Sequence, residues 1–467
     1  MQTPNSKLTR RRFLAQLSAA AGATVLAGCG APSATSTDGN QAGASPAAGA
    51  SPAAGATIAA EGSVVASVAP AETGGAVGFL NWEEIKGTPL ETALQAFEKS
   101  TGRKVNVQIA PEEYDTKMRT LLAGGIPPEV MRVNDDFVRG FSVAGQFLDL
   151  TPFIQTSNLN PDDYYEPVFN FPKQPDGKHT AWCLGNQPRL IYYNVNMFNE
   201  AGVPLPPTTW TDEGWKWDDF VERAKALTAE GERWGALVYD DTGYEQTFSV
   251  NNGNADGIWS ADGKRFALSE PQGVEAVQWA TDLTCVHHVQ PERSLITQRG
   301  AANQMFAAGK LGMIFRTFGT TPYFRTNVKD FEWDVAPPPG KVQQKTEGSL
   351  IVFCVPTSVK DQAGAWELLS FLSGPEGAKI FAEGGQFVPV LKQAAETIAP
   401  GDAPPKHIQL FAEAMNYQTT TNFTENTERA RQIYRPELDR VYICEATAAE
   451  VLNQVKQEVE DALVHKF

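Results

Sequence analysis

Between Gly74 and Val133 the chain reads GGAVGFLNWEEIKGTPLETALQAFEKSTGRKVNVQIAPEEYDTKMRTLLAGGIPPEVMRV. Apolar runs predict strands at 74–82, 104–109 and 129–133, and the segments between them predict helices at 89–100 and 114–123. The first of these helices has apolar residues at the i, i+3, i+4, i+7 spacing of an amphipathic helix, namely Leu90, Ala93, Leu94 and Phe97. Strands alternating with helices indicate an α/β fold in which a parallel sheet is covered by helices.

The same alternation continues toward the C-terminus. Further strands are predicted at 190–194, 311–315 and 349–355, and further helices at 196–201, 217–230, 274–283, 301–308, 362–372, 375–383 and 446–464. The roughly 390 residues that follow Gly75 exceed what one hydrophobic core usually supports. We therefore expect two α/β lobes.

The first 28 residues have the order of charges typical of an export signal. Four basic residues, Lys7 and Arg10 to Arg12, precede an apolar stretch from Phe13 to Ala27, which is too short to span a membrane stably. The string Thr9-Arg10-Arg11-Arg12-Phe13-Leu14 resembles the twin-arginine signal that exports folded proteins. An ordinary secretory signal with three consecutive arginines is the alternative.

Cys29 ends a stretch that resembles the bacterial lipobox, Leu26-Ala27-Gly28-Cys29. The resemblance implies that residues 1–28 are removed and that Cys29 carries acyl chains anchoring the protein to the outer face of the cell membrane. The alternative is a simple cleavage site at which Cys29 is incidental. Residues 29–75, rich in Ala, Gly, Ser and Pro, cannot bury enough apolar surface to fold and are expected to form a disordered tether.

The charge of the chain excludes several classes of partner. The formal net charge is −16 at pH 7, and no Lys/Arg run occurs after the signal. A strongly acidic surface argues against binding to nucleic acid or to an anionic membrane face.

The four cysteines after Cys29 are far apart and lack the C-x-x-C spacing of zinc or redox sites. Cys183 and Cys354 stand in strand-like runs and are expected to be small buried hydrophobic residues. We expect at most one disulfide, and neither a metal site nor a cofactor.

Several short strings, in this order along the chain, resemble those of the extracellular solute-binding proteins of ABC importers, in the carbohydrate-binding group that includes maltose-binding protein. They are Asp149-Leu150-Thr151-Pro152, Leu190-Ile191-Tyr192-Tyr193-Asn194, Thr209-Trp210, Trp217-Asp218-Asp219-Phe220, Phe306-Ala307-Ala308-Gly309-Lys310-Leu311-Gly312-Met313, Ala365-Trp366-Glu367-Leu368-Leu369-Ser370-Phe371-Leu372 and Ser373-Gly374-Pro375-Glu376-Gly377-Ala378.

The resemblance implies the two-lobed, type II binding-protein fold, in which each lobe is a mostly parallel sheet flanked by helices and a hinge closes the lobes on a ligand. One lobe would comprise 76–184 and 352–400, and the other 185–351 and 401–467. The chain would cross between them near 182–189, near 348–353 and near residue 400. The implied partners are a carbohydrate and the importer's membrane permeases with their cytoplasmic ATPase, and the implied form is a monomer.

A sugar site combines planar polar side chains for the hydroxyl groups with aromatic platforms for the apolar ring faces. Positions after strands, together with the family resemblance, give these candidate ligand-binding residues: Asn81, Trp82, Glu83, Asn134, Asp135, Asp136, Asn186, Gln187, Asn252, Trp259, Arg316, Phe318, Gly319 and Gly348. Two structural alternatives stay open. Trp82 would be a packing residue, and Asn134 to Asp136 would cap a helix.

No nucleophile elbow, metalloprotease motif or P-loop is present, so the sequence gives no sign of an enzyme. Two other functions stay open besides a sugar-importer subunit. The same fold could bind another small solute, such as a polyamine, a phosphodiester or a peptide. The chain could also be a surface lipoprotein hydrolase or a sensor domain.

Overall fold

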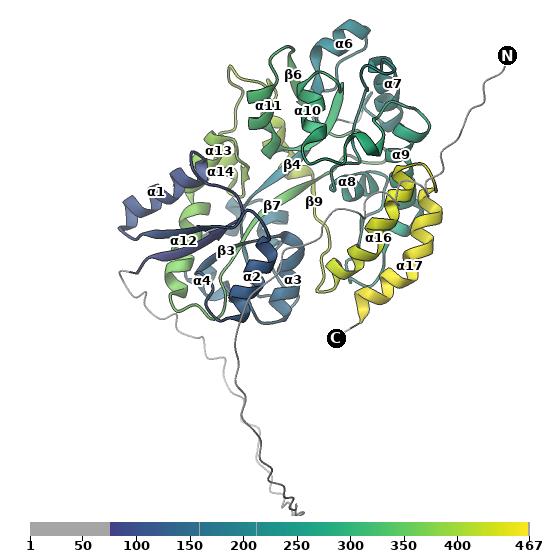
Figure 1. The fold of residues 1–467 in the computed structure, drawn as a ribbon. Helices are drawn as coiled ribbons and strands as arrows, with labels where there is room; N and C mark the ends of the chain where they lie inside the picture. Colours follow the sequence, from purple (N-terminus) through teal and green to yellow (C-terminus); the bar gives the residue numbers. More distant parts are fainter. Residues whose placement is uncertain (1–74, 158, 212, 466–467) are drawn as a thin grey trace, which may run out of the picture. The chain divides into compact units, whose positions relative to one another are not determined.

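Three parallel strands covered by helices open the folded part of the chain. In the computed structural model, β1 (Val77–Asn81) pairs in parallel with β2 (Val105–Ile109) and β3 (Val130–Val133), and α1 (Pro89–Thr101) and α2 (Tyr114–Ala123) connect them. All five predicted elements are confirmed to within a few residues (Figure 1).

The structure describes residues 75–157, 159–211 and 213–465, all of which belong to one compact unit. The predicted export signal, Cys29 and the predicted tether up to residue 74 lie outside these residues. Along the described parts of the chain, no helix is both long and apolar enough to cross a membrane.

Helix α1 shows why this part of the fold is easy to predict. Its N-cap Thr88 accepts a hydrogen bond from the Glu91 backbone N–H, Pro89 occupies the first turn, and Gly102 ends the helix with a φ of 76°. The apolar stripe identified in the sequence is buried. Caps and periodicity therefore agree on the same boundaries.

The long strand β4 (Trp182–Asn194) connects two groups of strands. Its first half pairs antiparallel with β7 (Thr346–Cys354), and its second half pairs antiparallel with β5 (Met313–Thr317) and β6 (Trp333–Ala336). The strand order is β2-β1-β3-β7-β4-β5, and the sheet is mixed. The mostly parallel pairing that was expected is found among β1, β2 and β3 and between β7 and β9 (Gln418–Thr419), whereas β4 pairs antiparallel with all its neighbours. The sequence predicts a strand only for 190–194, because polar residues interrupt the apolar run before it.

The other described elements surround these strands (Figure 1). They are α3 (Asp135–Val143), α4 (Thr151–Thr156), η2 (Pro161–Asp163), α5 (Glu166–Asn170), α6 (Val195–Ala201), α7 (Trp217–Leu227), α8 (Tyr244–Asn251), η3 (Ala267–Ser269), α9 (Pro271–Cys285), η4 (Arg293–Leu295), α10 (Ala301–Ala307), η5 (Phe318–Thr320), α11 (Thr321–Asn327), α12 (Gln362–Ser373), α13 (Pro375–Gly384), β8 (Val388–Pro389), α14 (Lys392–Ala395), α15 (Gln409–Glu413), η6 (Ala414–Tyr417), β9 (Gln418–Thr419), α16 (Thr427–Tyr442) and α17 (Ala448–Val464).

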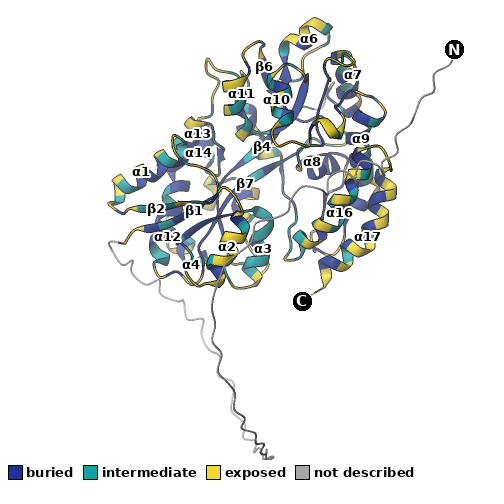
Figure 2. Ribbon diagram, viewed as in Figure 1, coloured by how far each residue is buried: buried dark blue, intermediate teal, exposed yellow. Residues whose placement is uncertain are grey.

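Helices α16 and α17 form a hairpin near the C-terminus. A capping box of Thr447 and Glu450 starts α17, which was predicted. Helix α16 was not predicted, because it contains Pro436 and is strongly polar. Figure 2 shows the buried side of both helices facing the rest of the molecule and the exposed side facing outward.

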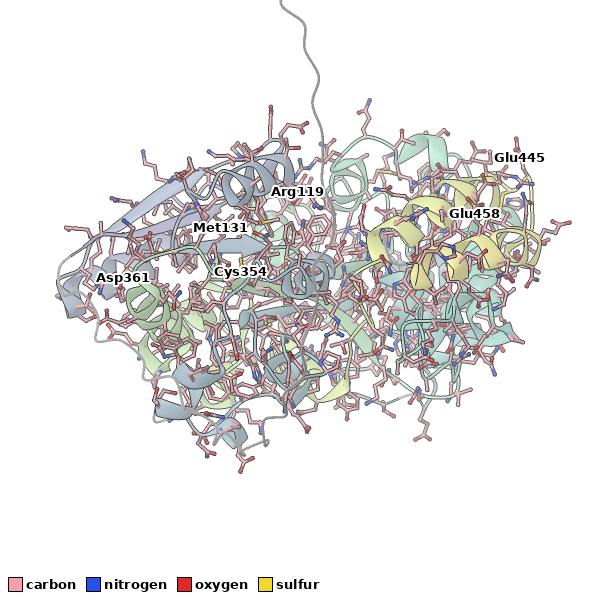
Figure 3. The ribbon with its side chains drawn as sticks, turned by 90° about the horizontal axis from the view of Figure 1, so that it is seen from below. Arg119, Met131, Cys354, Asp361, Glu445 and Glu458 are labelled. Carbon is pink, nitrogen blue, oxygen red and sulfur yellow. A yellow bond between two sulfur atoms is a disulfide. The ribbon has the colours of Figure 1, made fainter. Side chains whose placement is uncertain are left out.

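The cysteines agree with the expectation of at most one bridge. Cys285, the last residue of α9, is disulfide-bonded to Cys444, which lies in the turn between α16 and α17. Cys183 and Cys354 are buried and free, as expected. Cys354 stands opposite Met131 in the pairing of β7 with β3 (Figure 3).

Candidate functional site

A polar pocket of about 120 Å³ lies where β4, β7 and α16 meet the first turn of α3. Five charged residues line it, and Asp241 forms an ion pair with one of them, Arg189. Together they form what we call the charged cluster: Asp135, Arg189, Asp241, Glu347, Arg431 and Arg435. Gly348, a predicted ligand-binding residue, also lines the pocket. The pocket therefore combines side chains from segments that are far apart in the sequence.

Arg189 is the central cation of this cluster. It is buried, its Nε donates to Asp241 Oδ1 at 2.6 Å, and its Nη1 lies 3.6 Å from Glu347 Oε2. Burial alone would raise the pKa of Asp241, but Arg189 and Arg316 hold it below its usual value. Arg189 therefore stabilises a buried carboxylate.

Two other carboxyl groups of the cluster have raised pKa values. Burial raises the pKa of Glu347 to about 7, although Arg189 and the Thr421 hydroxyl oppose the shift. Burial, together with the neighbouring Asp136, raises the pKa of Asp135 to about 6. The pocket therefore changes its charge near neutral pH.

The predicted triplet Asn134, Asp135 and Asp136 stands at the start of α3. Asn134 is the N-cap residue but makes no capping hydrogen bond with its side chain, and the two acids occupy the first turn, where the helix dipole favours them. Asp135 lines the pocket, whereas Asp136 forms an ion pair with Arg431 of α16. Of the triplet, the structure thus places Asp135 in the lining of the pocket, and it gives Asn134 and Asp136 other contacts.

Trp82 packs against protein on one face and one edge. The Arg132 guanidinium lies 4.3 Å from the indole centroid, and Tyr114 meets Trp82 edge-on at 5.1 Å. Glu83 is exposed and lies 3.9 Å from Arg132. The Asn81 amide donates to the Glu83 carbonyl at 2.9 Å. The packing role considered for Trp82 is thus observed, and the side chain is still partly exposed.

Asn186 and Gln187 belong to an amide cluster with Gln386 and Gln418. Asn186 donates to Gln418 Oε1 at 2.7 Å, and Gln187 donates to the Gln386 carbonyl at 3.0 Å. A Cβ on Gly348 would lie 2.0 Å from Asn186 Oδ1, and one on Gly319 would lie 2.7 Å from Gln187 Nε2. The two predicted glycines therefore leave room for amide side chains of the protein itself.

The remaining predicted residues are buried among protein partners. Trp259 lies between Phe266 and Tyr434, with centroid distances of 5.3 and 5.6 Å. Phe318 packs against Phe411 at 4.5 Å. Neither ring has measurable exposure.

Two predicted polar residues also have protein partners. Arg316 binds both carboxylate oxygens of Asp240 and donates to Asn303 Oδ1 at 2.8 Å. Asn252 donates to the Gln272 carbonyl at 2.8 Å and to Glu275 at 2.9 Å.

A larger cavity of about 940 Å³ adjoins the polar pocket through Thr242, which lines both. Asp240, Asp241 and Thr317 line it where two neighbouring strand-like segments end. Arg316 of β5 forms an ion pair with Asp240, which brings the residues after 236–239 beside the C-terminal end of β5. Together the two cavities form the candidate ligand site.

Reasoning from the sequence missed much of the charged cluster. Asp240 and Asp241 follow the apolar run 236–239. Polar residues after such a run are the signal that identified the candidates at 81–83 and 134–136. Arg431 and Arg435 are one helical turn apart, but their helix was itself not predicted. Arg189 and Glu347 carry no local signal, since only the pairing of β4 with β7 brings them together.

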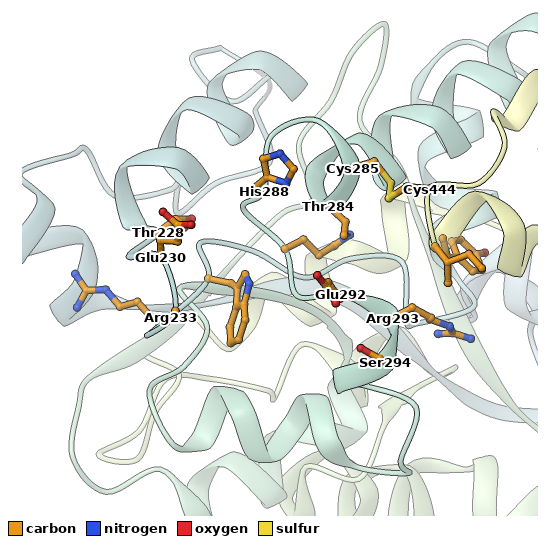
Figure 4. Close-up of a pocket in the computed structure, with 15 residues that line it drawn as sticks. Thr228, Glu230, Arg233, Thr284, Cys285, His288, Glu292, Arg293, Ser294 and Cys444 are labelled. Atoms are coloured by element: carbon orange, nitrogen blue, oxygen red, sulfur yellow. A yellow bond between two sulfur atoms is a disulfide. The ribbon is translucent and has the colours of Figure 1, made fainter. Parts of the chain in front are cut away.

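A third cavity, of about 620 Å³, lies beside the disulfide and contains none of the predicted residues. Figure 4 shows Cys285 and Cys444 on one side of it and Arg233 on the other. Arg293 lines both this cavity and the 940 Å³ cavity, so the two adjoin, but we do not include this one in the candidate ligand site because it holds none of the predicted residues.

Solved structures with the same fold include several binding proteins. An ABC substrate-binding protein of Listeria monocytogenes, in complex with cycloalternan, superposes with a TM-score of 0.74 at 22% identity and covers 84% of this chain and 100% of its own. The GacH receptor of Streptomyces glaucescens, solved without ligand and with acarbose, gives 0.71 at 17% identity, with 85% and 100% coverage. UgpB of Mycobacterium tuberculosis, in complex with glycerophosphocholine, gives 0.68 at 18% identity, with 84% and 98% coverage. These likenesses establish the two-lobed binding-protein fold.

Sequence comparison identifies the family. A binding protein of Brucella abortus is 24% identical over 355 residues, which cover 72% of this chain and 80% of the relative. Residues 92–409 match the family description "bacterial extracellular solute-binding protein". The chain therefore belongs to the bacterial extracellular solute-binding proteins.

Proposed function

We propose that this protein captures a carbohydrate outside the cytoplasm and delivers it to the permeases of an ABC importer. Membership of the solute-binding family supports the role, and fold neighbours in complex with cycloalternan and acarbose support the ligand class. The single observation that carries the proposal is the polar pocket between α3 and the β4, β7 and α16 side, joined to the larger cavity.

The charges around the pocket favour a neutral, hydroxyl-rich ligand. Each of the three guanidinium groups has a carboxylate partner within the protein, namely Asp241 for Arg189, Asp136 for Arg431 and Glu245 for Arg435, so much of the positive charge is compensated. A charged ligand would lose its hydration on entering the pocket, and the pocket has no excess of opposite charge to compensate that cost.

Some polar atoms beside the pocket can still form hydrogen bonds. Within the described part of the chain, Asp136 Oδ1, Arg431 Nε and Arg435 Nε are buried without a hydrogen-bond partner. These atoms are closed to solvent in this conformation, so a sugar would reach them only after the surrounding side chains move apart. Its hydroxyl groups, which both donate and accept, would then suit both kinds of atom.

The proposal is tested by a thermal-shift screen of sugars, including maltotriose, followed by calorimetry. A tight ligand raises the melting temperature in proportion to RT ln(1 + [L]/Kd). Trp82, the predicted aromatic platform, is not among the residues that line the two cavities, so its role is tested separately. Trp82→Ala should weaken sugar binding by about 1–3 kcal/mol, while Trp234→Ala, at the cavity beside the disulfide, should not. The absence of a shift with any sugar would overturn the carbohydrate proposal.

A glycerophosphodiester is the second candidate. Three arginines converge on the pocket, and guanidinium groups suit phosphate. A fold neighbour is known in complex with glycerophosphocholine. The same screen separates the two candidates, because a shift with glycerophosphocholine and none with sugars would select the phosphodiester.

The anchoring of the protein is part of the proposal. We expect a twin-arginine-type signal at 1–28, acylation of Cys29 and attachment to the outer face of the membrane. Cys29→Ala should move the protein from the membrane fraction to the medium or periplasm, and recovery of the variant with the membrane would contradict the anchor. We also expect a monomer without glycosidase activity, which light scattering and a glycoside assay would test.

The division into lobes at 76–184 plus 352–400 and 185–351 plus 401–467 also belongs to the proposal. The pairing of the two halves of β4 with different strands supports a crossing within β4. A ligand that touches both lobes would favour their closure in proportion to its extra affinity for the closed form.

A further inference from the structure

An ion pair joins two helices, α3 and α16, that follow different strands paired with β7. Helix α3 follows β3, which pairs with β7 at its C-terminal end, residues 352–354. Helix α16 follows β9, which pairs with β7 at its N-terminal end, residues 346–347. Asp136 of α3 nevertheless forms an ion pair with Arg431 of α16, across 295 positions of sequence.

The pair is largely shielded from water. The side chains of Arg431 and Asp136 are 19% and 11% exposed. Glu428 lies 3.8 Å from the same guanidinium group. It stands on α16 with Arg431, so its contact does not link the two helices. At this burial the removal of one partner leaves the other charge uncompensated, so breaking the pair has a larger effect than breaking an exposed one.

Apolar and backbone contacts surround the pair. Phe423 lies under the Arg431 guanidinium at 5.5 Å and meets Phe171, which precedes β4, edge-on at 6.2 Å. A Cβ on Gly140 of α3 would lie 3.6 Å from the Glu425 carbonyl oxygen, so the two backbones approach closely. Phe423 and Arg431 also line the polar pocket.

We propose that the Asp136–Arg431 pair, with Phe423 seated against Phe171, is a latch that holds the pocket closed and slows the release of ligand. This inference rests on the proposed binding function. It assigns Asp136 a positioning role through Arg431, whereas Asp135 keeps direct access to the pocket. The latch predicts that part of the closing free energy comes from the protein and not from the ligand.

The test measures the distance between the two sides in the full chain without ligand. Spin labels are placed at Lys117→Cys on α2 and Glu458→Cys on α17, in a Cys29→Ala background, and double electron–electron resonance gives the distance distribution. Both labelled positions are exposed. The latch predicts a narrow distribution for the parent and a longer, broader one for Asp136→Asn and for Arg431→Gln.

A charge swap and a matched control separate a latch from general loss of structure. Asp136→Arg combined with Arg431→Asp should restore the short distance. Arg440→Gln on the same helix, which removes the half-exposed pair with Glu437, should leave the distribution unchanged. Unchanged distributions in both single variants, or a swap that fails to restore the short distance, would overturn the latch.

Ligand release provides the second readout. With maltotriose or glycerophosphocholine, whichever shifts the melting temperature, stopped-flow dissociation should be roughly tenfold faster in Asp136→Asn than in the parent. An equal dissociation rate would count against the latch. If neither compound binds, the proposed function fails, while the distance measurement still decides the latch by itself.

Discussion

The amide cluster and the charged cluster both include residues of β4 and β7, and they are built differently. In the amide cluster, Asn186 and Gln187 are neutral, and Gly348 and Gly319 make room for them. In the charged cluster, Arg189 stands between Asp241 and Glu347. Neutral amides depend on the space around them, whereas buried charges depend on keeping their partners. The two clusters should therefore respond to different perturbations.

Removing the central cation should have the largest effect. Arg189→Met would leave Asp241 and Glu347 buried without their counter-ion and should cost about 3–5 kcal/mol of unfolding free energy, measured by urea denaturation. Arg265→Met, which removes surface ion pairs to Asp256 and Glu270, should cost less than about 1 kcal/mol. Similar losses in the two variants would contradict the distinction between buried and exposed charge.

Filling the space in the amide cluster should have a smaller effect. Gly348→Ala would place a methyl group 2.0 Å from Asn186 Oδ1, and overpacking of this kind costs about 1–3 kcal/mol. Adding Asn186→Ala should recover part of the loss, since it removes the clashing side chain. Gly401→Ala, where nothing lies within 4 Å of the added Cβ, is the control. If the double variant loses as much unfolding free energy as the two single variants together, the clash is not the cause.

The smallest effect should appear only as a dependence on pH. The pKa of Glu347 is raised to about 7 by burial, so the folded state binds its proton more tightly than the unfolded state. Stability from this group is therefore full below pH 4.5 and is lost as the pH rises from 4.5 through 7. Glu347→Gln should flatten the curve of melting temperature between pH 5 and 8. Glu458→Gln, on the exposed side of α17, is the control and should follow the parent curve. If the curve of Glu347→Gln also runs parallel to that of the parent, Glu347 is not the source of the pH dependence.

The sequence predicts most of the fold because its signals are local. The first five elements are announced by apolar periodicity and by caps such as Thr88 and Gly102. The candidate site is predicted only where polar residues directly follow a strand, as at Asp135. Arg189, Glu347 and Arg431 meet through the pairing of β4 with β7 and through a helix that contains a proline, and no local pattern reports such contacts.

Some predicted residues show the limit of assigning roles by type. Trp259 and Phe318 are the large aromatic rings expected of a sugar site, yet both are packed in the core. Gly348 was expected to let the backbone approach a ligand, and it accommodates Asn186. An aromatic or a glycine after a strand thus has the same sequence signature whether it serves a ligand or the packing.

Strand β4 has a consequence for how the protein loses its structure on heating. Its residues are buried except for Gln187, and the same continuous backbone supplies hydrogen bonds to β7 on one stretch and to β5 and β6 on the next. Melting either group of strands removes a neighbour from the other. Scanning calorimetry should therefore record one cooperative heat-absorption peak for the described unit and not two separate ones.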